Sequence, residues 1–293
     1  MITIAIPTYN RGTILVETID RLLQLTPPAD AILIADQTRE HPPDVMTKLL
    51  RWHDRNAIIW LRLQQPSIPR AMNDALEAAT TPLVLFFDDD IIPDANIVGA
   101  HLEAHQQHDV WAVAGQVLQP GENPEPPTNF SFRFNSTEGA YVNNVMAGNL
   151  SVKRDRALQI GGFDENFVAA AYRFETDFAM RITAAGGKVW FEPRASLRHL
   201  QLSTGGLRSY GDHRTAPIPA HSAGDYYFAL HHVPAFWRYA ARRLVQNVAT
   251  RYLARHPWRI PGKLVGEWRG LLLARELHRK GRRLRRVGSG KPT

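Results

Sequence analysis

The sequence predicts an α/β fold built around a largely parallel sheet. In the first part of the chain, short apolar runs alternate with segments whose apolar residues recur at helical spacing. The run LVLFF at residues 83–87 is apolar at every position, as expected for a strand that is covered on both faces of a parallel sheet. Strands that alternate with helices along the chain are typical of α/β domains.

Alternation, helical spacing and proline positions predict the first seven elements. Isoleucines alternate over residues 2–6 and stop at Pro7, which indicates a strand, and Pro27–Pro28 ends the helix that follows. Pro69 stands in the first turn of the third helix, where a backbone N–H is not needed. Together these patterns predict strands at residues 2–6, 31–36, 57–63 and 83–87, and helices at residues 13–25, 44–55 and 70–79.

Beyond Pro93 the pattern is looser. Glycine pairs at residues 161–162 and 186–187 end two helices. Residues 203–221 are rich in Gly, Pro and His without any period, and loops of this length are usually functional or disordered. The predicted elements are helices at residues 95–108 and 174–185, a short helix before residue 161, and strands at residues 111–118, 150–153, 188–193 and 196–200.

The composition is that of a globular protein with a sizeable core. Of the 293 residues, 44% are hydrophobic, 22% are charged and none is cysteine. The lack of cysteine excludes disulfides, iron–sulfur clusters and thiolate zinc sites. The chain enters its first strand without the basic and apolar regions of a secretory signal, so we expect a cytoplasmic protein.

Charge is distributed unevenly along the chain. Residues 1–232 contain 19 Lys and Arg against 26 Asp and Glu, a net charge of −7, whereas residues 233–293 contain 16 against 2, a net charge of +14. The sequence therefore predicts an acidic body followed by a strongly basic extension, and the two need separate explanations.

Polar side chains follow three of the predicted strands, at the carboxyl ends where open α/β sheets bind ligands. The segment PTYNR starts at Pro7, Asp36 ends the second strand, and Asp88, Asp89 and Asp90 follow the fourth. Like charges this close repel one another unless a cation is present. Extended backbone would place Asp88 and Asp90 on one side, as oxygen ligands suited to Mg²⁺ or Mn²⁺, and Asp89 on the other. A solvated acidic turn is the alternative.

Several further motifs occur in a fixed order, and the ordered set is more specific than any member. They are PTYNR (7–11), Asp36, RAMND (70–74), FFDDD (86–90), AGNLSVKR (147–154), GGFDENF (161–167), FETDFAMR (174–181) and His199. Over roughly residues 1–200 this set resembles the family 2 glycosyltransferases of the GT-A fold, a Rossmann-like fold that binds nucleotide sugars.

The resemblance implies an inverting transfer of a sugar from a nucleotide-sugar donor, with a divalent metal ion, Mn²⁺ or Mg²⁺, as cofactor. It places Asp36 towards the base and Arg70 near the diphosphate. Two departures concern the nucleotide: the second strand ends in Asp36–Gln37 instead of two acids, and RAMND stands where Arg-Asn-x-Gly is common. The implied donor-binding residues are Pro7, Thr8, Tyr9, Arg11, Asp36, Arg70, Asp88, Asp89, Gly148 and Asn149, and the implied metal ligands are Asp88, Asp90 and His199.

Inversion by direct displacement needs a carboxylate that takes the proton of the acceptor hydroxyl. The segment FETDFAMR offers Glu175 and Asp177, which point about 200° apart on a helix and cannot share one cavity. Asp177 lies four residues before Arg181, a spacing that favours an ion pair within the helix. We therefore predict Glu175 as the catalytic base, with Asp177 as the alternative.

The basic extension contains two segments with apolar residues at helical spacing, one starting near Trp237 and one near Leu264, followed by the run RKGRRLRR at residues 279–286. Such helices can lie on an anionic membrane face. Two alternatives remain: the apolar stripe packs on the catalytic domain, or the arginines are simply solvated. No nucleic-acid-binding module accompanies the charge, so we do not expect nucleic acid as a partner.

These observations predict a GT-A catalytic domain at residues 1–232 and a basic, helical extension at residues 233–293. Within the domain, residues 1–117 form the nucleotide-sugar-binding half and residues 118–232 form the acceptor-side half and loop. We expect a UDP-sugar donor, with dTDP- and GDP-sugars as alternatives, and a lipid-linked or growing glycan as acceptor, as in polysaccharide biosynthesis. The protein would act in the cytoplasm or peripherally on the cytoplasmic membrane face. The rivals are a scaffold that binds nucleotide sugars without turnover and a nucleotidyltransferase, although PTYNRGT is unlike the glycine-rich phosphate loop that the latter needs.

Overall fold

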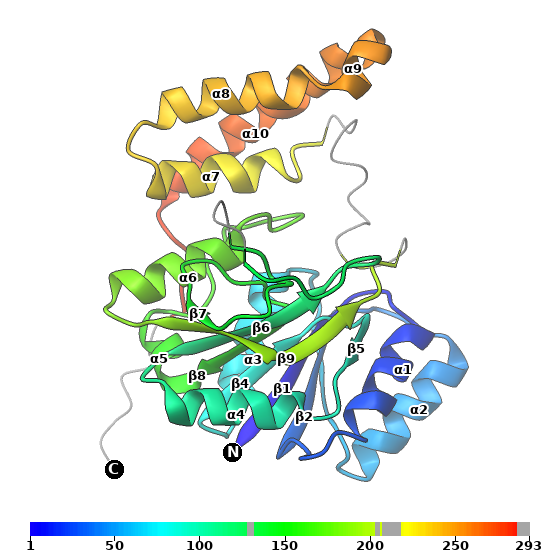
Figure 1. Cartoon of the computed structure of the whole chain (residues 1–293). Coiled ribbons are helices and arrows are strands. Elements are labelled where there is room, and N and C mark those ends of the chain that lie inside the picture. Colours follow the sequence, from blue (N-terminus) through cyan, green and yellow to red (C-terminus); the bar gives the residue numbers. More distant parts are fainter. Residues whose placement is uncertain (128–131, 203–205, 207–217, 286–293) are drawn as a thin grey trace.

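The computed structural model describes residues 1–127, 132–202, 206 and 218–285. These residues form one central sheet flanked by helices, with a further layer of helices at one end (Figure 1). The predicted α/β class is confirmed. Most of the loop predicted at residues 203–221 lies outside the described residues.

The described residues contain a nine-stranded sheet with the order β3-β2-β1-β4-β8-β6-β9-β5, in which β7 pairs with β9. The first four strands are parallel to one another, as predicted, whereas β8 is antiparallel to both β4 and β6. The strands are β1 (Ile2–Thr8), β2 (Ala31–Asp36), β3 (Ile59–Arg62), β4 (Leu83–Phe87), β5 (Ile91–Pro93), β6 (Ala112–Leu118), β7 (Ala140–Tyr141), β8 (Asn149–Lys153) and β9 (Val189–His199).

Two predicted strands merge into β9. The register between β6 and β9 shifts between Gly115 and Gln116, so that residues 193–195 bulge out of the ladder. The bulge explains why the sequence pattern breaks there although the strand continues. The short strands β5 and β7 were not predicted.

The sheet has an apolar cluster on each face, and the residues of β1 alternate between them. Ile2, Ile4 and Ile6 are fully buried on the face covered by α1, α2 and α4, whereas Ala5 belongs to the cluster under α3, α5 and α6. This alternation follows from the two-residue period of a strand. A sheet buried on both faces leaves the ends of its strands as the place for polar side chains.

Helices cover both faces and then form a separate layer. In Figure 1, α7, α8 and α10 lie side by side beyond α6, away from the sheet. Helix α7 was not predicted because residues 222–229 are all buried, so no apolar stripe marks it. The helices are α1 (Thr13–Leu22), α2 (Pro43–Asp54), α3 (Ile68–Ala78), α4 (Ile97–Gln107), α5 (Arg154–Gln159), α6 (Phe174–Ala184), α7 (Ser222–His232), α8 (Phe236–Val248), α9 (Arg251–Arg255), a 3₁₀ turn (Pro257–Arg259) and α10 (Ile260–Lys280).

Helix α10 lies close against α7 because its inward face carries small residues. Gly266, Gly270 and Ala274 are buried at intervals of four residues. A Cβ atom at Gly270 would overlap the side chain of Ser222 and approach the backbone of Ala223. The distance between the two helices therefore depends on the absence of a side chain at position 270.

We expect Gly270→Ala to destabilise the protein by about 1–3 kcal/mol, because the added methyl group must push α10 away from α7. The matched control is Gly262→Ala in the same helix, where a Cβ would meet nothing within 4 Å. That change should be neutral or stabilising by up to about 1 kcal/mol, since alanine favours helix more than glycine does. Urea unfolding of both variants would measure the difference, and equal stabilities would contradict the packing argument.

Candidate active site

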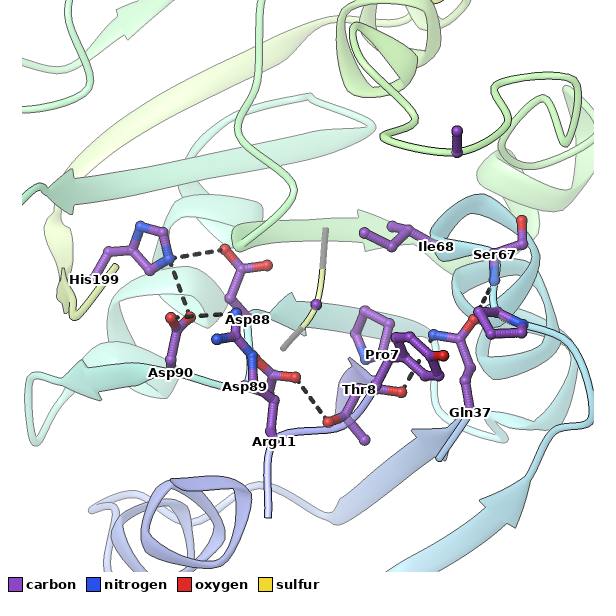
Figure 2. Close-up of a pocket in the computed structure, with 14 residues that line it drawn as sticks. Pro7, Thr8, Arg11, Gln37, Ser67, Ile68, Asp88, Asp89, Asp90 and His199 are labelled. Atoms are coloured by element: carbon purple, nitrogen blue, oxygen red, sulfur yellow. Dashed lines mark hydrogen bonds and ion pairs between the residues drawn. The ribbon is translucent and has the colours of Figure 1, made fainter. Parts of the chain in front are cut away.

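The first candidate site is a cavity of about 250 Å³ at the carboxyl ends of β1 and β4 (Figure 2). Because these strands are parallel and adjacent, the segments that follow them meet at one edge of the sheet. The residues that line this cavity are Pro7, Thr8, Tyr9, Arg11, Gln37, Pro66, Ser67, Ile68, Asp88, Asp89, Asp90, Ala169, His199 and Gly206.

The three consecutive aspartates point in two directions, as the extended backbone predicts. Asp89 turns towards β1, where its carboxylate accepts a hydrogen bond from the Thr8 hydroxyl at 2.7 Å and pairs with Arg11 at 2.8 Å. Asp88 and Asp90 turn towards His199, at 3.8 and 3.1 Å. The run is therefore part of the cavity wall and not a solvated acidic turn.

Strand β5 explains why His199 stands beside the aspartates. This short strand follows the aspartates directly and pairs antiparallel with the end of β9, with Ile91 opposite His199. The His199 Nδ1 lies 3.0 Å from Gln119 Oε1, which orients the ring so that Nε2 faces the carboxylates.

Asp88, Asp90 and His199 fit a divalent metal ion. One ligand atom from each lies within 4.8 Å of the other two. Two carboxylates and an imidazole supply oxygen and nitrogen ligands suited to Mn²⁺ or Mg²⁺, with room for substrate oxygens on the open side of the group. This is the set of three ligands that the resemblance implied.

Burial and neighbouring charges shift the pKa values of the aspartates and of His199. Burial raises the pKa of Asp89 to about 7, against the lowering effect of Arg11. Burial also acts to raise the pKa of Asp90, but the hydrogen bond from His199 and the charges of His199 and Arg11 hold it below its usual value. For His199, burial acts to lower the pKa, but the hydrogen bond to Asp90 and the charges of Asp88 and Asp90 together raise it above its usual value. Arg11 and His199 thus keep Asp90 ionised.

Asp36 is enclosed instead of facing the cavity. Its Oδ1 accepts a hydrogen bond from Thr38 N at 2.8 Å, and its Oδ2 lies 2.6 Å from His41 Nε2 and accepts from Trp60 Nε1 at 2.9 Å. The neighbouring Gln37 lines the cavity and is held by the backbone of Ser67 and Thr8. The predicted contact between Asp36 and the base stays a prediction.

Three other residues of the implied donor site lie outside this cavity lining. Arg70 is half-buried and donates to Gln65 at 3.2 Å. Asn149 is buried beneath the site and donates to Gln116 O and Ala195 O. Gly148 lies against Asp88, because a Cβ there would overlap its carboxylate. Their roles in donor binding also stay predictions.

A second cavity of about 370 Å³ adjoins the first and shares Pro7, Ile68 and Asp88 with it. Its wall is largely apolar and includes two groups that lie outside the motifs found in the sequence, residues 144–146 and the aromatic residues Phe134 and Tyr172. Neither group is marked by a sequence motif, because only the tertiary fold brings these residues to the cavity wall. The full lining is Pro7, Ile68, Met72, Asp88, Phe134, Asn144, Val145, Met146, Ala147, Gly148, Ala170, Ala171, Tyr172, Arg173, Phe174, Glu175 and Thr176.

The two candidate bases have different surroundings. Glu175 lines the second cavity, and burial, with a smaller effect from Asp88, raises its pKa to about 7. Asp177 is fully buried elsewhere and pairs with Arg181 at 2.8 Å, as its spacing predicted. Burial acts to raise the pKa of Asp177, but His232, Arg181 and Arg282 hold it well below its usual range. Of the two, only Glu175 lines a cavity, and its role as the base stays a prediction.

The fold is that of a GT-A glycosyltransferase. Residues 3–177 match the family model described as glycosyl transferase family 2, and the chain belongs to that family. The resemblance seen in the sequence and the expectation of a glycosyltransferase are confirmed. No curated protein matches the sequence.

Solved structures of low sequence identity share the fold. GalNAc-T7 with UDP, GalNAc and Mn²⁺ has a TM-score of 0.64 at 12% identity, over 94% of this chain and 56% of that chain. The mannosyltransferase PcManGT from Pyrobaculum calidifontis, in complex with GDP-Man and Mn²⁺, has a TM-score of 0.54 at 15% identity, over 99% of this chain and 76% of that chain. S. aureus TarS has a TM-score of 0.54 at 13% identity, over 69% of this chain and 37% of that chain. The chain thus spans well under two thirds of TarS and GalNAc-T7.

We expect Asp90→Ala to weaken Mn²⁺ binding more than about tenfold, because it removes one ligand and leaves His199 without its partner. Asp94→Ala, an exposed carboxylate four residues on, is the matched control and should bind like the unchanged protein. Titration with Mn²⁺ followed by electron paramagnetic resonance, with UDP or GDP present, would measure both. Equal affinity in the two variants would exclude Asp90 as a ligand.

Proposed function

We propose that this glycosyltransferase moves a sugar from a nucleoside-diphosphate sugar to an acceptor hydroxyl, with inversion and by direct displacement. One observation carries the proposal: the candidate metal ligands and Glu175 lie in adjoining cavities that share Asp88. A donor in the first cavity would present its anomeric carbon at the boundary, and an acceptor in the second would place its hydroxyl beside Glu175.

The first cavity suits a nucleoside diphosphate. Pro7, Thr8 and Tyr9 form its floor at the end of β1, and Gln37 offers an amide to the base. A divalent ion held by Asp88, Asp90 and His199 would supply positive charge to the leaving diphosphate. Arg11, bound to Asp89 and Asp90, adds a fixed cation in the same wall.

Glu175 would act as the base. As the acceptor oxygen bonds to the anomeric carbon, the bond from that carbon to the diphosphate oxygen breaks, and the hydroxyl proton passes to the Glu175 carboxylate. A pKa of about 7 suits this task, because the group is partly ionised at neutral pH and still basic enough to take a proton. The enclosed position of Asp177 supports this choice.

The apolar second cavity supports an acceptor with a hydrophobic face, such as a sugar ring of a lipid-linked or growing glycan. Phe134 and Tyr172 are suited to pack against such a ring. We therefore retain polysaccharide biosynthesis on the cytoplasmic side of a membrane as the proposed setting, and a UDP-, dTDP- or GDP-sugar as the donor. The rival, a scaffold that binds donor without turnover, predicts binding without transfer.

We expect transfer, or slow donor hydrolysis, from one member of a nucleotide-sugar panel in the presence of Mn²⁺. Glu175→Gln should abolish transfer and leave donor binding intact, because Glu175 lies in the acceptor cavity alone. Since the pKa of Glu175 is raised, the base is protonated below pH of about 7, and kcat should fall about tenfold per pH unit there.

Nucleoside diphosphate release at each pH would measure this dependence. Thr183→Ser, at an exposed position of the same helix outside both cavity linings, is the control and should keep the pH profile unchanged. A Glu175→Gln enzyme with undiminished transfer would exclude the base, and donor binding without turnover under every condition would favour the scaffold.

We also infer that the helical layer rests on an anionic membrane, because α10 is turned with its apolar side outwards. Its fully buried residues are Lys263, Gly266, Glu267, Gly270 and Ala274, and Leu271 and Leu277 pack partly buried against the core beside them. Its exposed face includes Leu264, Val265, Trp268 and Leu272. A helix whose whole apolar stripe packed on the core would not expose these four large side chains.

Exposed tryptophans and arginines accompany this face. Trp237, Trp258 and Trp268 are 62%, 69% and 61% exposed, a pattern found at membrane interfaces. Within the part of the chain that the structure describes, no carboxylate lies within ion-pair distance of six exposed arginines, namely Arg238, Arg242, Arg251, Arg255, Arg269 and Arg279. None of the helices described is long and apolar enough to cross a membrane.

Anionic lipid matches this surface better than a second copy of the chain, which would bring the same arginines together. Each basic residue near such a surface contributes about 1 kcal/mol, and tryptophan side chains anchor at the headgroup level. The two contributions act together on a helix that lies in the interface.

We expect the protein to bind phosphatidylglycerol-containing vesicles and to bind phosphatidylcholine vesicles much less. Trp258→Ala/Trp268→Ala should weaken binding at least about tenfold, whereas Leu23→Ala/Leu50→Ala, a pair of exposed apolar residues at α1 and α2, should not. Co-sedimentation at low and high salt would measure this, and the charge contribution should fall with salt. Equal binding to both vesicle types, or none to either, would contradict the proposal.

A further inference from the structure

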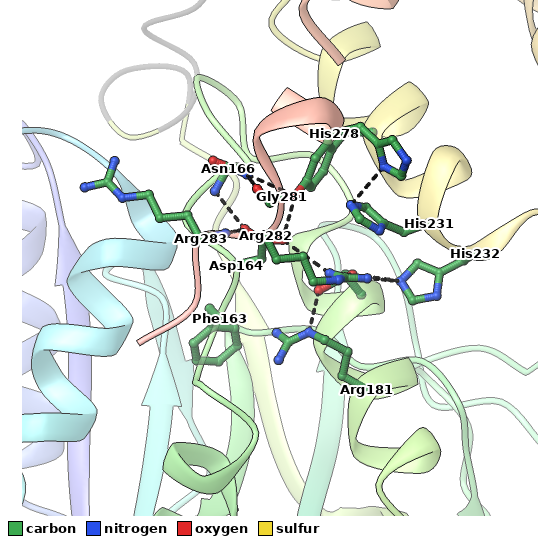
Figure 3. Close-up of polar contacts among 12 residues, drawn as sticks. Phe163, Asp164, Asn166, Arg181, His231, His232, His278, Gly281, Arg282 and Arg283 are labelled. Carbon is green, nitrogen blue, oxygen red and sulfur yellow. Dashed lines mark hydrogen bonds and ion pairs between the residues drawn. The ribbon is translucent and has the colours of Figure 1, made fainter. Parts of the chain in front are cut away.

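The basic run at the end of the chain does not lie free in solvent. Residues 281–285, which we call the C-terminal strap, leave α10 at Gly281 and run back onto the catalytic domain (Figure 3). The strap forms backbone hydrogen bonds with the loop at residues 161–166, from Glu165 N to Arg283 O at 3.0 Å and from Arg285 N to Gly161 O at 2.9 Å. Asn166 donates to Gly281 O at 2.6 Å.

All three arginines of the strap bind carboxylates of the catalytic domain, and Arg283 lies 3.3 Å from Glu165. Arg285 pairs with Glu165 and Asp74, each at 2.6 Å. Arg282 donates from Nη1 to Asp177 at 2.6 Å and lies 3.2 Å from Asp164. This arrangement gives part of the basic extension a structural role and leaves the outward arginines of α8 and α10 for other partners.

Asp177 is the centre of this network. It is fully buried in the first half of α6, where Arg181 binds one carboxylate oxygen and both Arg282 and His232 bind the other. His232 comes from α7, and its Nε2 also lies 3.2 Å from Arg282. A buried carboxylate needs such partners, because an uncompensated charge in the interior is strongly unfavourable.

The network lies two residues from the proposed base. Glu175 and Asp177 share the first turns of α6, and on a helix they point to different sides. The strap and α7 therefore hold the rear of α6, while Glu175 faces the acceptor cavity from its front. A displacement of these turns would move the Glu175 carboxylate from the attacking hydroxyl, and misplacement by about 1 Å can reduce rates about a hundredfold.

We propose that Arg282 is a positioning residue for the transfer reaction, which sets the orientation of Glu175 by binding Asp177 and His232. The inference rests on the proposed role of Glu175. It also links the helical layer to the catalytic machinery, because His232 ends α7 and the strap follows α10. Arg282 does not touch either cavity lining, so it contributes to catalysis only through α6.

The test compares Arg282→Gln and Arg282→Lys with Arg279→Gln, an exposed arginine of the same basic run, in the full-length protein without lipid. Arg282→Gln should lower kcat for transfer about tenfold or more and leave donor affinity unchanged, because the donor cavity is not involved. Arg282→Lys should lie in between, since one ammonium group cannot reproduce the fork of a guanidinium. Arg279→Gln should behave like the unchanged protein.

Two further measurements separate positioning from general stability. Hydrogen exchange should be faster in the α6 amides of Arg282→Gln and unchanged in β1 and β4. The double variant Asp177→Asn/Arg282→Gln should recover part of both properties, because it removes the charge that Arg282 compensates. Recovery of kcat and of slow α6 exchange can be measured as long as the double variant folds. The comparison therefore tests the positioning role of Arg282 even if Arg282→Gln alone is poorly folded.

The inference would be overturned if Arg282→Gln left both kcat and the exchange of the α6 amides unchanged. It would also be overturned if this variant lost donor affinity and stability together and Asp177→Asn did not restore them. If the unchanged enzyme transferred sugar to no acceptor, the proposed function would fail. The exchange experiment would still report whether Arg282 holds α6.

Discussion

Buried carboxylates need positively charged partners, and in this molecule that need decides which segments of the chain lie side by side. Three adjacent aspartates end β4, and Asp90 is almost completely enclosed. Their charges are tolerated because β1 brings Arg11 and β9 brings His199 to the same place. The pairing of β5 with β9 makes the second contact possible, so the fold and the candidate metal site depend on one another.

The same constraint explains the uneven charge of the chain. In the helical layer, Asp225 of α7 pairs with Arg173 and Arg243, and Glu267 of α10 pairs with Arg243 and Lys263. The strap extends this matching to the carboxylates of the catalytic domain. Breaking a buried pair by removing one partner is more unfavourable than never having formed it. The inward cations of the extension and the acids of the body therefore constrain each other, and the remaining arginines are left on the outside.

The sequence was sufficient where a local pattern and the tertiary environment agree. The strands before the aspartates alternate or are wholly apolar, and their ends placed Asp88 and Asp90 at one edge of the sheet, whereas His199 came only from the family resemblance. The sequence does not predict helix α7, because the helix is packed on all sides and its apolar residues do not form a single stripe at helical spacing. Gln37 and Tyr172 reach the cavity walls through contacts between distant segments, which no spacing encodes. For Asp36, the resemblance suggested a contact with the nucleotide base. That Thr38, His41 and Trp60 bind its carboxylate could be seen only in the fold.

The orientation of α10 shows why a helical pattern does not by itself decide which face turns inwards. An apolar stripe containing Trp268 and Leu272 would ordinarily pack on the core. Here Gly266 and Gly270 lie on the opposite face and allow the backbone to approach α7 more closely than large side chains would. The inward polar residues, Lys263 and Glu267, form an ion pair at 3.0 Å, so they can be buried beside the smaller apolar contribution of Leu271 and Leu277. Close backbone packing and paired charges thus hold the layer to the enzyme, and the apolar stripe remains outside for a hydrophobic partner.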